Sequence, residues 1–270
     1  MIRALAFLLA VVFVGSPAFG QGDQTSLIEA ANAAFDEAAG LREADPPRAN
    51  ILLGDAINGW TDVMREGEFE NGLLHYNIAN AHLLRDEVGF AVLHYRRADE
   101  LSPGDRRVLA NLLQARLRVE GGAIPSASSG ALETILFFHT GMTERARFLS
   151  SAVTFALCWL VAGLVVWRAL PRGALWLSAA CSIVWVATGA SLAVDSLDDT
   201  RAGVLVGADV TGRKGPDATG YDPSFTRPLS AGVEFTLVEK RGGWLLIRLA
   251  DDRETWVLGA SARFLEPLVP

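Results

Sequence analysis

Two long apolar stretches without a charged side chain constrain the fold of this chain more than any other feature. Residues 148–167 form a run of 20 and residues 174–194 a run of 21, and neither contains Asp, Glu, Lys or Arg. An α-helix rises about 1.5 Å per residue, so about 20 residues cross the roughly 30 Å hydrocarbon layer of a bilayer. Two buried core helices of a soluble protein are the alternative, but runs of this length favour transmembrane helices.

A short connector, residues 168–173, joins the two stretches. Arg168 and Arg172 place positive charge there, while Pro171 and Gly173 interrupt helical structure. So short a connection predicts a tight hairpin, which returns the chain to the side of the membrane from which it came. The regions before and after the hairpin are therefore expected on the same side.

The first 20 residues indicate which side this is. Arg3 precedes an apolar core, and Ala18 and Gly20 supply small residues at positions −3 and −1 of a cleavage site, the pattern of a secretory signal peptide. Arginines do not decide the orientation, because Arg145 and Arg147 before the first stretch balance the two in the connector. We expect a bacterial inner-membrane protein with both soluble regions in the periplasm.

The net charge and the two cysteines limit the functions that this chain can have. Residues 24–120 carry a net charge of −6 and residues 195–270 one of −3, which disfavours nucleic-acid binding. Cys158 and Cys181 lie in the apolar stretches, so they form no disulfide framework and act as small apolar residues; an interhelical bond or palmitoylation is the alternative.

No motif for catalysis, a metal or a cofactor is found in the sequence. The histidines do not form a His-Glu-x-x-His motif, and His75 and His82 would lie about 10 Å apart along one helix. A nucleophile elbow, a phosphate loop and a dinucleotide fingerprint are also missing. We therefore expect no enzyme activity, no metal site and no cofactor. The four histidines are His75, His82, His94 and His139.

Residues 26–120 have the apolar periodicity of α-helices, with breaks at residues 45–47, 65–67 and 102–104. A small residue, an aromatic residue and another small or medium residue also recur after 35 positions. Small residues let two helices approach closely while the aromatic ring fills the groove, so these positions are predicted to form the core of a helical repeat block. They are Ala56, Trp60 and Val63, then Ala91, Tyr95 and Ala98.

Residues 72–105 resemble the tetratricopeptide repeat (TPR). Ile78 and Ala79 occupy the Leu-Gly positions of the TPR consensus, and His82 lies at its first Tyr position but departs from that residue. Ala91, Tyr95, Ala98 and Pro103 match the second helix and the closing proline, whereas His75 departs from the consensus Trp. Residues 27–67 match in their second helix only. Residues 105–119 are expected to form a capping helix whose inward-facing residues are Val108, Leu109, Leu112 and Leu113.

The resemblance implies a concave face that binds partner proteins. The candidate residues for this face are Leu73, Tyr76, Asn80, Leu83, Arg107 and Asn111. Asn80, Asn111 and Arg107 occupy positions used by TPR domains that clamp a C-terminal carboxylate, but Tyr76 replaces the second basic residue. A partial clamp and helix-packing asparagines therefore remain as alternatives.

Residues 121–147 connect the helical block to the first apolar stretch. Glycines, Pro125 and a Ser/Gly run predict a flexible linker up to Gly130. Residues 132–148 are amphipathic, which fits either a helix lying in the membrane interface or a plain entry helix.

Residues 202–268 change to short alternating strands, predicted at 204–210, 233–239, 244–249 and 254–258. Residues 243–247, 251–253 and 255–258 resemble the end of bacterial SH3 domains, although Thr255 replaces a common Gly. The resemblance implies a small all-β barrel with residues 211–230 as its variable loop. Trp244 and Phe235 are expected in the core, and Tyr221 and Trp256 are candidates for a peptide groove.

The order of these parts resembles the BatE family of the Bacteroides aerotolerance (Bat) operons. A signal peptide, a TPR block, two membrane helices and an SH3-like barrel follow one another, and the specific matches lie mainly within residues 73–103. The resemblance implies an envelope scaffold that works with von Willebrand factor A-domain proteins in stress or oxygen tolerance. The alternative is a cell-wall sensor that binds murein through the barrel.

Overall fold

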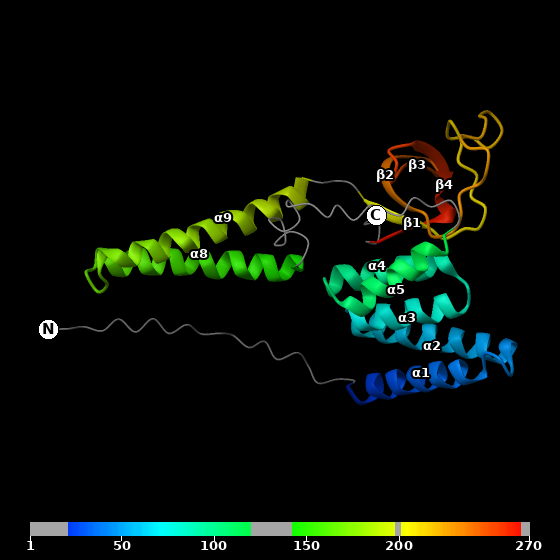
Figure 1. Cartoon of the computed structure of the whole chain (residues 1–270), viewed down its shortest axis with the longest axis horizontal. Helices are drawn as coiled ribbons and strands as arrows, with labels where there is room; N and C mark the ends of the chain where they lie inside the picture. Colours follow the sequence, from blue (N-terminus) through cyan, green and yellow to red (C-terminus); the bar gives the residue numbers. More distant parts are fainter. Residues whose placement is uncertain (1–20, 120–141, 198–200, 266–270) are drawn as a thin grey trace.

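A computed structural model describes residues 21–119, 142–197 and 201–265 (Figure 1). Within these ranges the chain is mostly helical and has one small antiparallel sheet. The predicted signal peptide and most of the predicted linker lie outside the described residues. The helices are α1 (Gln21–Leu41), α2 (Pro46–Gly67), α3 (Gly72–Leu84), α4 (Val88–Leu101), α5 (Arg106–Leu117), α8 (Glu144–Val166) and α9 (Leu175–Leu197), and the strands are β1 (Ala202–Leu205), β2 (Glu234–Arg241), β3 (Trp244–Leu249), β4 (Glu254–Leu258) and β5 (Ala262–Phe264).

Helices α1 to α5 follow one another in a stack (Figure 1). The predicted breaks at 45–47 and 102–104 lie at the start of α2 and after the end of α4, whereas residues 65–67 still belong to α2, and the turn between α3 and α4 was not predicted. Side-chain caps define three of the helix starts, because each cap satisfies a backbone N–H that the first turn leaves without a partner. Asp45 accepts from the N–H of Arg48 at 3.2 Å, Asn71 from that of Leu73 at 2.9 Å, and Asp105 caps α5.

The recurring small and aromatic positions of α2 and α4 form the core, as predicted. Each of the six side chains is no more than 1% exposed. The capping-helix prediction is partly wrong, because Val108 and Leu112 are buried but Leu109 and Leu113 are 44% and 46% exposed. On α5 the buried side chains are Val108, Leu112 and Ala115, and positions 109 and 113 lie one residue further round the helix.

Helices α8 and α9 pack side by side as an antiparallel hairpin (Figure 1). A short 3-10 turn, Arg172–Ala174, leads into α9. Both helices are long and apolar enough to cross a membrane, and only 6% and 11% of their most apolar windows are buried. This exposure differs from that of core helices in a soluble protein. At the helix contact, the thiol of Cys158 lies 3.3 Å from Ser178 Oγ, and both cysteines are free thiols.

The five strands pair in the order β4-β3-β2-β1-β5, all antiparallel. Strands β4 and β5 are the two edges, so the pairing does not close the barrel that the sequence predicts. Strands β3 and β4 have the predicted bounds, whereas β5 was not predicted. β1 ends at Leu205 rather than at residue 210, and beyond it Val210 makes only an isolated bridge to Leu229.

The sheet rests on the helical block rather than standing apart from it. Val204 of β1 and Leu265 after β5 share one apolar cluster with Ala91 and Val92 of α4. Gly89 of α4 approaches so closely that a Cβ atom there would lie 2.7 Å from the Leu205 carbonyl oxygen. Figure 1 shows the sheet next to α4 and α5.

Candidate protein-interaction surface

Four of the six predicted partner-binding residues come together on α3 and α5. Asn111 donates from Nδ2 to Tyr76 Oη at 3.1 Å and to Asn80 Oδ1 at 3.0 Å. The guanidinium carbon of Arg107 lies 5.7 Å from the centroid of the Tyr76 ring. The two helices therefore present one connected aromatic and amide surface.

Tyr95, which the sequence assigned to the core alone, also belongs to this network. Its hydroxyl donates to Asn80 Oδ1 at 2.6 Å, and its ring centroid lies 6.0 Å from that of Tyr76. Burial, helped by the neighbouring Tyr76, raises the pKa of Tyr95 far above its ordinary value. The hydroxyl is therefore a donor at any physiological pH, and it holds Asn80 in place.

This geometry favours helix-packing asparagines over a carboxylate clamp. Asn80 Oδ1 accepts two internal hydrogen bonds, from Tyr95 and Asn111. Arg107 donates to Asp105 Oδ2 at 2.7 Å, so a partner carboxylate would have to compete with an internal one. The hydrogen bonds from the side chain and backbone of Arg107 lower the pKa of Asp105 to about 2.

Leu73 and Leu83 differ in their surroundings. Leu73 is 55% exposed near the start of α3. Leu83 is partly buried and packs against the apolar cluster that includes Ala91 and Val92 of α4. The open part of the surface is therefore Leu73 and the rim of Tyr76, and Leu83 contributes to packing.

The two groove candidates of the sheet are also unequal. Tyr221 is 48% exposed, but Trp256 is 8% exposed, with the Arg241 guanidinium carbon 5.5 Å from its ring centroid. Phe235 is buried as predicted; Trp244 was wrongly placed in the core and is only half-buried. Trp244 pairs with Leu258 at the exposed end of the β3–β4 ladder, which explains this difference.

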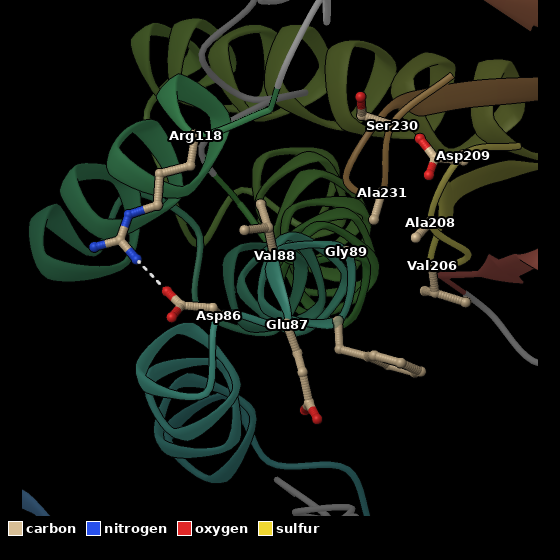
Figure 2. A pocket seen from close by; sticks show the side chains of 11 residues that line it. Asp86, Glu87, Val88, Gly89, Arg118, Val206, Ala208, Asp209, Ser230 and Ala231 are labelled. Carbon is tan, nitrogen blue, oxygen red and sulfur yellow. Dashed lines mark ion pairs between the residues drawn. The ribbon is translucent and has the colours of Figure 1, made fainter. Parts of the chain in front are cut away.

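A cavity of about 500 Å³ lies where the start of α4 meets the loops beside β1 (Figure 2). Figure 2 shows Asp86 and Arg118 paired on one side, with Asp209 and Ser230 on the other. Because both soluble parts line this cavity, its shape depends on how the sheet is docked.

A charged bridge centred on Glu234 also joins the helices to the sheet. Arg116 Nε donates to its carboxylate at 2.6 Å, and Arg96 Nη1 donates at 2.5 Å. Burial would raise the pKa of Glu234, but the hydrogen bonds and charges of the two arginines outweigh burial and lower it. Nothing in the local sequence indicates this bridge, since Glu234 is more than 110 residues away from either arginine.

Comparisons with protein-family models, with curated proteins and with solved structures give no match. In the described part of the chain no group of three His, Cys, Asp or Glu side chains could hold a metal ion.

Proposed function

We propose that this protein is a membrane-anchored scaffold that binds other proteins through the face of α3 and α5. One observation carries this proposal: Tyr76, Asn80 and Asn111 are held by mutual hydrogen bonds beside the exposed Leu73. A surface fixed before binding loses little side-chain freedom when a partner docks, and aromatic residues dominate such contacts.

The wider setting of this proposal follows the family resemblance. The helical block would be of the TPR type and the sheet of the SH3 type, in a BatE-like protein of the bacterial inner membrane. Its partners would be envelope proteins with von Willebrand factor A domains, and the process would be stress or oxygen tolerance. The scaffold itself would carry no enzyme activity.

The proposed topology can be tested with reporter fusions. A reporter that is active only in the periplasm should be active when fused after Val119 or after Pro270, because the hairpin returns the chain to one side. The same reporter inserted at Pro171 should be silent. Reporter activity at Pro171 together with silence at the other two positions would show that the orientation is the opposite of the proposed one.

The proposed binding face can be tested by placing a charge at its open apolar residue. Leu73→Asp should weaken co-purification with a von Willebrand factor A-domain protein about tenfold or more, since an unpaired carboxylate would have to lose water on binding. Melting should not change, because Leu73 is 55% exposed. Ile51→Asp is the matched control, as Ile51 is 66% exposed on α2, outside the proposed face.

Equal recovery with the two variants would contradict the scaffold proposal. The alternative, a cell-wall sensor, is favoured by the exposed Tyr221, whose loop is held to β4 through Arg213. If that alternative is right, Tyr221→Ala should reduce sedimentation with purified murein while Leu73→Asp leaves it unchanged.

A further inference from the structure

Three of the four histidines meet between α3 and α4. His75 and His94 approach with their Nδ1 atoms 2.9 Å apart, and the rings of His82 and His94 are stacked with centroids at 5.5 Å. His75 and His82 are 2% and 9% exposed. We call these three residues the histidine cluster.

The hydrogen bonds of the histidine cluster are satisfied when all three rings are neutral. His75 Nε2 is bonded to the Glu70 carboxylate and His82 Nδ1 lies 2.6 Å from the Glu87 carboxylate, so each donates an N–H there. The remaining Nδ1 of His75 then accepts from Nδ1–H of His94. A second proton on His75 would go to Nδ1, put two N–H groups face to face and break this bond. A second proton on His94 would go to Nε2 and place a positive charge beside the stacked His82 ring.

The charges facing the cluster come from α4 and from the turns on either side of α3. Glu70 and Glu87 favour protonation of His75 and His82, while Arg97 and Arg85 oppose it. Burial has the largest effect and lowers the pKa of both histidines. His94 has no facing carboxylate among the groups that affect it. Burial, then His75, His82 and Arg97, lower the pKa of His94 furthest.

Arg97 connects this cluster to the sheet. It lies one turn after His94 on α4, and its Nε and Nη2 donate to the carbonyls of Leu265 and Phe264 at 2.9 and 3.0 Å. A positive charge on His94 or His75 would repel Arg97 at the point where it holds the end of β5.

We propose that the histidine cluster is an acid-sensitive joint: its protonation loosens the packing of α3 against α4 and weakens the hold of Arg97 on the sheet. The cavity beside the start of α4 would change with it, because Glu87, whose carboxylate bonds His82, is one of the residues that line the cavity. The joint concerns the internal arrangement of the soluble parts and does not depend on which partner binds.

The direction of the pH effect follows from linkage. In the unfolded chain these histidines take up protons near the ordinary pKa of 6.5, whereas the folded protein takes them up at lower pH. Folding stability is therefore complete above about pH 6.5 and falls as the pH drops below it. Each such histidine changes the unfolding constant by up to about tenfold per pH unit.

The full chain in detergent should melt about 5 °C or more lower at pH 5.0 than at pH 7.5. His94→Asn should lose at least half of this shift, because the amide keeps a donor near Nδ1 and does not titrate. His82→Asn keeps a donor toward Glu87 and should also lose part of the melting shift between the two pH values. This second variant tests the proposal if His94→Asn does not fold. His139→Asn, outside the described residues, is the control and should melt like the wild type at both pH values.

Spin labels can report the sheet itself. With Cys158 and Cys181 changed to Ser, labels on the exposed residues Gln114 of α5 and Lys240 of β2 should give a narrow distance distribution at pH 7.5. The distribution should broaden at pH 5.0 and stay narrow in a foldable cluster variant. An unchanged wild-type distribution, or equal broadening and equal melting shifts in wild type and cluster variants, would overturn the proposal.

Discussion

Replacing Tyr95 with Ala is expected to lower the free energy of unfolding of the helical block by about 3–5 kcal/mol, the usual cost of removing a buried aromatic ring. Tyr95 is fully buried on α4, and its hydroxyl donates to Asn80 at 2.6 Å. The substitution would therefore leave a cavity and also remove the bond that holds Asn80. Thermal melting of the full chain should show a drop of more than 10 °C.

Two further variants make this result specific. Tyr221→Ala makes the same change at a residue that is 48% exposed, and should shift melting by no more than a few degrees. Ala91→Arg should be at least as damaging as Tyr95→Ala, because Ala91 is fully buried in the apolar cluster that α4 shares with α3 and α5. Unchanged melting in both Tyr95→Ala and Ala91→Arg would reject the repeat core.

Replacing Glu234 with Ala should destabilise the docked arrangement by about 3–5 kcal/mol, because it leaves two partly buried guanidinium groups without their common partner. The Glu234 side chain is 12% exposed, and those of Arg116 and Arg96 are 21% and 28% exposed. The effect should be measured as a melting shift at pH 7. It should fade as the pH falls below the ordinary 4.5, because Glu234 has a lowered pKa and its carboxylate gives stability only while ionised.

Glu239→Ala is the matched control on the same strand. Glu239 pairs with Arg241 at 2.7 Å, but these side chains are 43% and 64% exposed, and exposed pairs contribute about 0–1 kcal/mol. A similar small shift for both variants would show that the Glu234 bridge does not hold the sheet on the helices.

The features that could be predicted from the sequence depend on signals within one turn or one hairpin. The break at Asp45 and the bounds of β3 and β4 are of this kind, because a cap or a turn acts on its immediate neighbours. The 35-residue recurrence also allowed core residues of α2 and α4 to be predicted, since equivalent positions of two similar helices face the same way.

The features that could not be predicted depend on packing between distant segments. In the sequence, Glu234 is an ordinary carboxylate at the start of a strand. Its pairing with the two arginines depends on how α4 and α5 pack against the sheet. The alternation of apolar and polar residues places Trp244 and Trp256 on strands, but it does not show which of the two rings is buried. The contact between His75 and His94 could not be predicted from their spacing, because His75 lies on α3 and His94 on α4, with a turn between the two helices.

The connection between α9 and β1 limits how far the soluble parts can reach. From Leu197 to Ala202 the chain makes five steps, which extend at most about 18 Å. If α9 spans a bilayer as proposed, the Leu73 face would be kept near the lipid surface, because the sheet is bridged to α4 and α5 through Glu234. Partners that are themselves held at the membrane would therefore meet this face at a much higher local concentration than freely diffusing ones.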